Sequence, residues 1–320
     1  TFSAPSGVAH AVDGVDLTVR QGETVALVGE SGSGKTATAL AILRLVEPEG
    51  HIGHGAQIRL DGRDLLALPP REIRTVRGNH VALVFQEPGA ALNPVISVGG
   101  HIVEALRAHH RISKRDAWAR AVEMLRTVGV PEPEVRARHY AHQLSGGLRQ
   151  RAMLAIALAC HPKLLIADEP TTALDVTIQA EILALLAELR SKSGMAVLLI
   201  THNLGIVAEH AERAYVMYAG QIVEEAPVTR LFAAPVHPYT EGLLAAVPRP
   251  DEKRPRLTAI PGQIPEATDW PAGCRFHPRC PWAWERCRTD APQLLDVSAG
   301  HRARCWLVVE PARRTGATAV

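Results

Sequence analysis

The sequence predicts an α/β fold with a mainly parallel sheet, an inserted all-helical subdomain and a Pro-rich, Cys-rich C-terminal appendage. Strand-like apolar runs alternate with helical patterns, and this order favours parallel strands. From about residue 93 to residue 142 the apolar spacing is helical, whereas 12 of the 23 prolines fall at or after Pro235. We therefore expect an α/β domain over residues 1–230, with its helical subdomain at about 93–160, and a C-terminal region over 231–320.

The first elements of the chain surround a glycine-rich loop. Alternating apolar residues over 15–19 predict an opening strand, residues 24–28 predict a short buried strand, and residues 37–45 predict a helix. Between the last two lies a run that fits the pattern G-x-x-x-x-G-K-[ST] in its required strand–loop–helix context. The run is Gly29-Glu30-Ser31-Gly32-Ser33-Gly34-Lys35-Thr36. Without that context, a Gly/Ser-rich turn carrying a lysine would be the alternative interpretation.

This loop is suited to bind the phosphates of a nucleotide. Glycines allow backbone N–H groups to converge on phosphate oxygens, and the following helix N-terminus adds positive potential. Lys35 would reach the β- and γ-phosphates, and the Thr36 hydroxyl would face Mg²⁺. The residues expected to contact the nucleotide are Gly29, Ser31, Gly32, Ser33, Gly34, Lys35 and Thr36.

The remaining elements follow in order. The sequence Leu60-Asp61-Gly62-Arg63 predicts a hairpin turn, and 81–85 predicts a strand. Ser113 has the position of a helix cap, before a helical pattern that continues to Val128. Further on, 164–167 and 196–200 predict strands, 178–189 predicts a helix, and a hairpin is expected around 219–220.

Polar residues stand at the ends of three predicted strands. Asp168 and Glu169 follow one apolar run, where Asp168 would hold Mg²⁺ and Glu169 could polarise an attacking water. Gln86 could bind Mg²⁺ or orient water, and His202 could donate a hydrogen bond to a γ-phosphate. Taken singly, each could be an ordinary polar residue at a strand end; the phosphate loop favours the functional interpretation.

A second anion site is indicated by Ser145, Gly146 and Gly147 before an apolar helix. Ser145 has the position of an N-cap, so a capped loop-to-helix transition is the plain interpretation. A capped helix N-terminus preceded by glycines also attracts anions. Because the chain already has a phosphate loop, this second site suggests a role toward another subunit's ligand.

Bulk composition excludes several classes. The net charge is +2 over 320 residues, so there is no bulk argument for a nucleic-acid partner. No apolar run approaches the roughly 18 residues that span a bilayer, and no secretory signal is visible. We expect a cytosolic chain.

The last four of the five cysteines form a candidate metal site. Their spacing is Cys274-x5-Cys280-x6-Cys287-x17-Cys305. Four thiolates suit either tetrahedral Zn²⁺ or an iron–sulfur cluster, and the long gaps are loose for zinc. His277 and His301 keep a mixed zinc site open, and free thiols are a third alternative. Cys160 is expected to be a buried core residue on an apolar helix over 153–160.

Together these motifs resemble the nucleotide-binding subunits of ATP-binding cassette (ABC) transporters over residues 8–228. The resemblance depends on the order of the glycine-rich loop, Gln86, the Ser145 motif, Asp168-Glu169, Ala173-Leu174-Asp175 and His202. It implies a P-loop ABC-type nucleotide-binding domain that binds ATP and Mg²⁺. It also implies a head-to-tail pair of such subunits, with Ser145, Gly146, Gly147 and Asp175 at the seam. The resemblance further implies that Glu169 is the general base or a water-orienting carboxylate and that His202 stabilises the γ-phosphate.

Narrower features resemble the ATP-binding subunits of bacterial dipeptide/oligopeptide importers. They are 85–88, 91–94, 167–177, 216–220, 237–240 and the cysteine-rich tail. This resemblance favours a [4Fe–4S] cluster on Cys274, Cys280, Cys287 and Cys305. It implies a second ABC ATPase subunit, two transmembrane permease subunits and an extracytoplasmic solute-binding protein, with this chain at the cytoplasmic face of the membrane. Related nickel and other small-solute importers, a soluble non-transport ABC ATPase, and a regulatory subunit are the alternatives.

Overall fold

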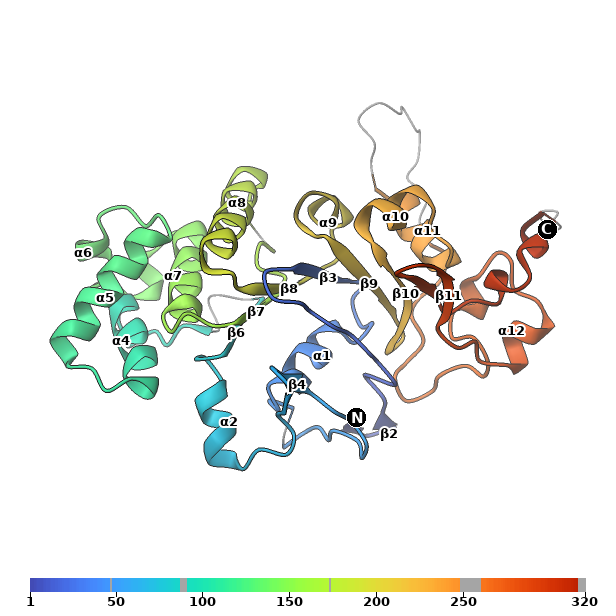
Figure 1. The fold of residues 1–320 in the computed structure, drawn as a ribbon, viewed down its shortest axis with the longest axis horizontal. Helices are drawn as coiled ribbons and strands as arrows, with labels where there is room; N and C mark the ends of the chain where they lie inside the picture. The colour runs from blue at the N-terminus through green and yellow to red at the C-terminus, as the bar shows by residue number, and fades with distance from the viewer. Residues whose placement is uncertain (47, 87–90, 173, 248–259, 316–320) are drawn as a thin grey trace. The chain divides into compact units, whose positions relative to one another are not determined.

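The computed structural model describes residues 1–46, 48–86, 91–172, 174–247 and 260–315 (Figure 1). The chain divides into two compact units. The first unit comprises Thr1–Thr18, Thr24–Ala56 and Thr201–Val320. The second comprises Val19–Glu23 and Gln57–Ile200. Within the described ranges, none of the helices combines the length and apolar character needed to cross a membrane.

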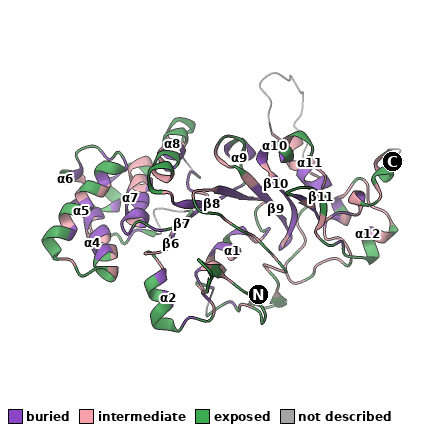
Figure 2. Cartoon of the chain, viewed as in Figure 1, coloured by how far each residue is buried: buried purple, intermediate pink, exposed green. Residues whose placement is uncertain are grey.

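In the first unit, the strands of one sheet follow the order β11-β12-β10-β9-β3. Strand β3 pairs with β9 in parallel, and the other neighbours are antiparallel. The strands of this unit, including a separate pair of β1 and β2, are β1 Phe2–Ala4, β2 Gly7–Ala9, β3 Thr24–Val28, β9 Arg213–Tyr218, β10 Gln221–Pro227, β11 Leu295–Ser298 and β12 His301–Ala303. Every residue of β3 is buried, as its apolar sequence predicts (Figure 2). The predicted hairpin at Ala219-Gly220 is confirmed, and both residues have the positive φ angles of a tight turn.

The strand predicted over 15–19 is wrong. No strand is assigned to these residues, because side chains satisfy backbone groups that a ladder would otherwise use. The Thr18 N–H donates to the Tyr215 hydroxyl at 3.0 Å, and Arg213 donates to the Thr18 carbonyl at 2.5 Å. Alternating apolar residues alone did not reveal these non-local partners.

Short helices complete the first unit. They are α1 Lys35–Ile42, α9 Leu204–His210, α10 Val228–Ala233, α11 Pro238–Ala245, α12 Glu285–Thr289 and the 3₁₀ turns η2 His277–Arg279, η3 Trp306–Val308 and η4 Pro311–Thr315. Helix α1 therefore begins and ends earlier than the predicted 37–45. The segment after residue 230 contributes Tyr239 and Phe276 to one core with Tyr218, and β12 pairs with β10. The division near residue 230 stays a prediction.

The second unit pairs β6, β7 and β8 in parallel, in that order. Its strands are β4 Arg59–Leu60, β5 Arg63–Asp64, β6 Val81–Val84, β7 Leu164–Asp168 and β8 Ala196–Thr201, whose last residue is assigned to the first unit. Its helices are α2 Pro70–Val76, α4 Val98–His109, α5 Lys114–Thr127, α6 Pro133–Arg136, η1 Ala141–Gln143, α7 Gly146–Leu158 and α8 Val176–Ser193. The predicted β4–β5 hairpin is confirmed, with Asp61 and Gly62 both at positive φ.

Residues 98–158 form a group of helices, α4 to α7, as the spacing predicted (Figure 1). Ser113 caps α5 by accepting the Asp116 N–H at 3.1 Å. Cys160 is buried, as expected, but it lies two residues beyond the end of α7 at Leu158. Helix α7 begins directly after Ser145, so the Ser145 motif lies at the N-terminus of this helix.

Candidate functional site

The phosphate loop of the first unit connects β3 to α1 and is shaped by close backbone approaches. Gly34 has a φ of +107°, and a Cβ there would lie 2.3 Å from the Ala11 carbonyl oxygen. At Gly29 a Cβ would lie 2.2 Å from the Met217 carbonyl oxygen. No larger residue fits either position without moving the backbone.

The polar groups of this loop suit a bound triphosphate. Lys35 is buried, and its Nζ donates to the carbonyls of Gly29 at 2.8 Å and Glu30 at 3.0 Å. Gly34 is the N-cap residue of helix α1 and has no side chain to cap it, so the first N–H groups of the helix face no capping oxygen. The buried Ser33 Oγ has no hydrogen-bond partner among the described residues, and Thr36 is exposed. A cradle of this kind binds phosphate.

A hydrogen-bonded carboxylate lies at the end of β7 in the second unit. Glu169 accepts hydrogen bonds from the Gln86 amide at 3.1 Å and from the Thr172 hydroxyl at 2.8 Å. Its φ of +47° is unusual for a non-glycine residue, and its N–H is held by the Ile200 carbonyl at 2.9 Å. Such strain is characteristic of functional positions and costs on the order of 1–3 kcal/mol. Asp168, one residue earlier, is buried.

The structure thus brings Gln86 and Glu169 together. This is expected, because the two residues follow neighbouring strands of one parallel sheet, whose carboxyl ends lie at the same edge. His202 is exposed and follows β8 directly, at the start of the segment that the first unit contributes. Asn203 next to it caps α9 by accepting the Gly205 N–H at 2.9 Å.

The Ser145 motif and Asp175 lie close together in the second unit. Ser145 caps α7 and Asp175 caps α8, accepting the N–H groups of Leu148 at 3.4 Å and Ile178 at 2.9 Å. A Cβ on Gly147 would be 2.9 Å from an Ile178 methyl group, so the two helix starts are packed tightly. Ser145 and Gly146 remain exposed, which leaves one helix N-terminus open to an external anion.

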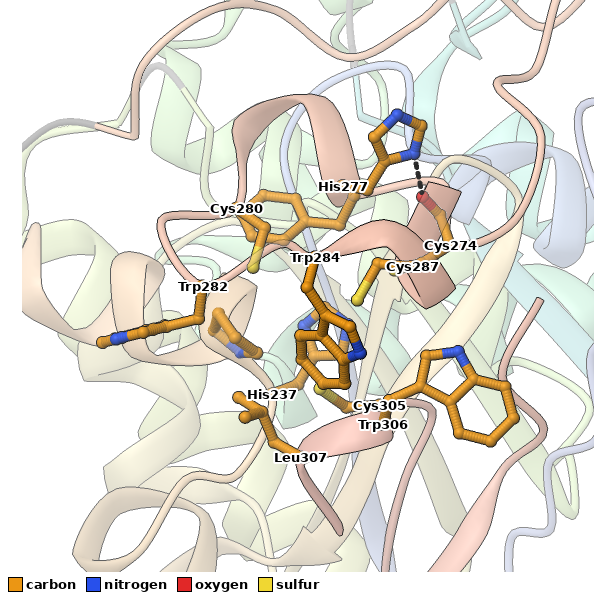
Figure 3. Close-up of a pocket in the computed structure, with 12 residues that line it drawn as sticks. His237, Cys274, His277, Cys280, Trp282, Trp284, Cys287, Cys305, Trp306 and Leu307 are labelled. Carbon is orange, nitrogen blue, oxygen red and sulfur yellow. Dashed lines mark hydrogen bonds between the residues drawn. The ribbon is translucent and has the colours of Figure 1, made fainter. Parts of the chain in front are cut away.

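The C-terminal cysteines share one pocket in the first unit (Figure 3). Cys274, Cys280, Cys287 and Cys305 line it and form no disulfide. The pocket is also lined by His237, His277, Trp282, Trp284 and Trp306. Three segments distant in sequence therefore converge here.

The thiols nevertheless do not form a coordination group. In the described residues, no three His, Cys, Asp or Glu side chains are arranged to hold a metal ion. Burial raises the pKa of Cys274 to about 11 and the pKa of Cys305 to about 12, so both are neutral thiols as they stand. The predicted iron–sulfur site is therefore not confirmed: the donor set suits a cluster, but its arrangement does not hold one.

The histidines considered for a mixed zinc site have other partners. His301 Nε2 lies 2.8 Å from the buried Glu224 carboxylate, and His301 does not line the cysteine pocket. His277 Nδ1 lies 3.0 Å from the Cys274 carbonyl (Figure 3). The suggestion that His301 could bind zinc together with the cysteines is thus wrong.

Two features were missed from sequence. Thr172 donates to Glu169, and its spacing of three residues from the carboxylate was the available signal. The C-terminal contacts to the phosphate loop described below had no local signal. Glu87 and Pro88 of the Gln86 stretch, and Ala173 before Asp175, lie outside the described residues.

The sequence matches two known families. Residues 12–172 match the family described as ABC transporter. Residues 223–287 match the family described as oligopeptide/dipeptide transporter, C-terminal region.

Individual relatives are similar over most of their length. The oligopeptide transport ATP-binding protein AppD of Bacillus subtilis is 51% identical over 300 residues, covering 94% of this chain and 92% of that protein. The probable peptide ABC transporter ATP-binding protein y4tR of Sinorhizobium fredii is 50% identical over 306 residues, covering 95% of this chain and 91% of that protein. A solved structure of the bacterial ABC transporter cassette MJ0796, as a dimer, is 30% identical with a TM-score of 0.61, covering 68% of this chain and 90% of that one.

Proposed function

The chain belongs to the ATP-binding subunits of ABC transporters, and from this premise we propose that it hydrolyses MgATP to power the import of oligopeptides or dipeptides. The observation that carries the catalytic part is Glu169, held by Gln86 and Thr172 at the end of a parallel strand. The peptide cargo is supported by the C-terminal family match and by the names of the relatives.

Each site residue has a proposed role. Lys35 and the loop N–H groups bind the β- and γ-phosphates, and Thr36, Gln86 and Asp168 hold Mg²⁺ directly or through water. Glu169 activates the attacking water. The role of His202 is to donate a hydrogen bond to the γ-phosphate.

A second ATPase subunit completes the proposed site. The open N-terminus of α7 at Ser145, Gly146 and Gly147 is suited to the γ-phosphate of ATP held by a partner subunit. Asp175, next to it, belongs at the same seam. Two permease subunits and an extracytoplasmic solute-binding protein complete the proposed transporter, and the permease subunits hold this chain at the cytoplasmic face of the membrane.

The substitution Glu169→Gln tests the catalytic assignment in the assembled transporter. The amide keeps the size of the side chain but removes the basic carboxylate, so ATP hydrolysis should fall by at least about 100-fold, the usual scale of general-base catalysis. MgATP binding should persist. Glu188→Gln, at an exposed position of α8, is the matched control and should hydrolyse ATP at the wild-type rate. Wild-type turnover by Glu169→Gln would refute the role of Glu169.

We also propose that the cysteine pocket takes up a [4Fe–4S] cluster. Four unpaired thiols around one pocket support this proposal, and binding would have to draw the thiolates into a coordinating arrangement. Anaerobic purification followed by absorption spectroscopy and metal analysis tests it. Four irons per chain with a brown colour are expected. One zinc per chain, or no metal, would contradict the cluster.

A further inference from the structure

The C-terminal region makes direct contact with the phosphate loop through Glu30, the second residue of that loop. All three polar groups of Glu30 are engaged. Its N–H donates to the Tyr239 hydroxyl at 2.8 Å, and its carbonyl accepts from Lys35 Nζ at 3.0 Å. Its carboxylate receives two hydrogen bonds from Arg279, at 2.8 and 3.0 Å. Two of these three contacts come from residues more than 200 positions away.

Arg279 is built into the C-terminal region. Its side chain is only 4% exposed, and its Nε donates to the Pro261 carbonyl at 2.7 Å. The guanidinium lies 5.7 Å from the centre of the Tyr218 ring, within the range of a cation–π interaction. A bidentate arginine fixed in this way imposes both a position and an orientation on the carboxylate it holds.

Tyr239 is held just as firmly. It is fully buried, and its ring lies 4.7 Å from the ring of Tyr218 and 5.5 Å from that of Phe276. Burial raises the pKa of the Tyr239 hydroxyl, so the hydroxyl stays neutral and can accept the Glu30 N–H. The same aromatic group therefore supports both residues that contact Glu30.

We propose that Arg279 and Tyr239 are positioning residues for ATP: they hold Glu30, fix the first turn of the phosphate loop and neutralise the loop's acidic side chain. This inference rests on the proposed function, because it assumes that the loop binds ATP. It makes the C-terminal region a part of the nucleotide site. An unpaired Glu30 carboxylate would repel the phosphates that the loop binds, and pairing with Arg279 removes this repulsion.

The substitution Arg279→Gln tests the proposal by a split between KM and kcat. In the assembled transporter the KM for ATP should rise about tenfold, because the Glu30 carboxylate loses its charge-assisted hydrogen bonds and stays unpaired in a loop that binds a polyanion, whereas kcat should stay within about twofold. The double variant Glu30→Gln/Arg279→Gln should restore the KM to within about threefold, because the unpaired charge is gone. Rescue by removing a second side chain is not expected of general destabilisation.

Arg304→Gln is the matched control. Arg304 is also partly buried in the C-terminal region and donates to the Ile222 and Pro292 carbonyls, yet it makes no hydrogen bond to the loop. It should lower thermal stability without changing the KM. Equal KM values for wild type, Arg279→Gln and Arg304→Gln would overturn the proposal.

A second measurement covers the case in which Arg279→Gln does not fold. Tyr239→Phe removes only the hydroxyl, and in the full chain without nucleotide it should accelerate hydrogen exchange of the peptide containing residues 29–36 by about tenfold or more. Unchanged exchange would contradict the positioning role. If the transporter with the wild-type chain failed to bind or hydrolyse MgATP in the KM measurement, the proposed function itself would be wrong, which is a separate result.

Discussion

The phosphate loop and the cysteine pocket both gather groups for a ligand, but they are built in opposite ways. The loop presents backbone N–H groups and one lysine from eight consecutive residues, and close contacts to Ala11 and Met217 fix its path. The pocket presents side chains from separate segments, and its thiols share a space without forming a coordination group. Backbone sites are formed by folding alone, whereas side-chain sites of this kind depend on the ligand to complete them.

The largest expected effect concerns the backbone of the loop. Gly34→Ala should weaken MgATP binding on the order of 100-fold, because the new Cβ meets the Ala11 carbonyl at 2.3 Å and backbone strain costs up to about 3 kcal/mol. Equilibrium titration with a fluorescent ATP analogue measures this loss.

Gly32→Ala is the matched control for this substitution. Gly32 also has a positive φ, +82°, but nothing lies within 4 Å of a Cβ there, so the loss should be about tenfold or less. Equal losses at both positions would mean that close approach to Ala11 does not shape the site.

A smaller effect is expected from pH on the region around the pocket. Burial lowers the pKa of His237 from 6.5 to about 4, and its Nδ1 accepts the Tyr239 N–H at 3.1 Å. At a pH between these two pKa values, His237 binds a proton in the unfolded chain but not in the folded chain. The free energy of unfolding should therefore fall with decreasing pH, by about 2 kcal/mol between pH 7.5 and pH 5.

Urea unfolding at the two pH values measures this decrease, and His237→Asn provides the comparison. Asparagine can still cap α11 but does not titrate, so the variant should lose less stability on acidification than the wild type. Parallel decreases in both proteins would show that His237 is not the responsible group.

The smallest expected change in ATP affinity comes from removing cysteines of the pocket, and it tests whether the pocket and the phosphate loop bind their ligands independently. Replacing Cys280 and Cys305 with serine should abolish metal uptake, since two of the four donors are lost. Because no hydrogen bond among the described residues joins either cysteine to the loop, the Kd for MgATP should change by less than about threefold. Metal analysis and ATP titration on the same preparations measure both quantities.

Cys160→Ser is the control, since Cys160 is buried in the other unit. It should retain both metal and ATP binding. A large loss of ATP affinity in the Cys280/Cys305 variant would mean that the cysteine pocket, and not only Arg279 and Tyr239, determines the conformation of the phosphate loop.

Features built from consecutive residues could be predicted from the sequence, whereas features built from distant segments could not. Strand β3 and the phosphate loop are local, so their pattern was sufficient to predict them, although α1 begins at Lys35, two residues before the predicted start. Glu169 and Gln86 were placed at strand ends from apolar runs alone, and the parallel sheet brought them together. The absence of a strand at 15–19 and the contacts of Glu30 could not be predicted, because Tyr215, Tyr239 and Arg279 come from distant parts of the chain.

The central claim, that this chain turns ATP hydrolysis into peptide uptake, is tested most directly in proteoliposomes that contain the assembled transporter. With MgATP inside and a peptide-loaded binding protein on the opposite side, labelled peptide should accumulate with the wild-type chain and not with Glu169→Gln. Accumulation with Glu169→Gln at the wild-type rate, or no MgATP-dependent uptake of any peptide, would contradict the claim.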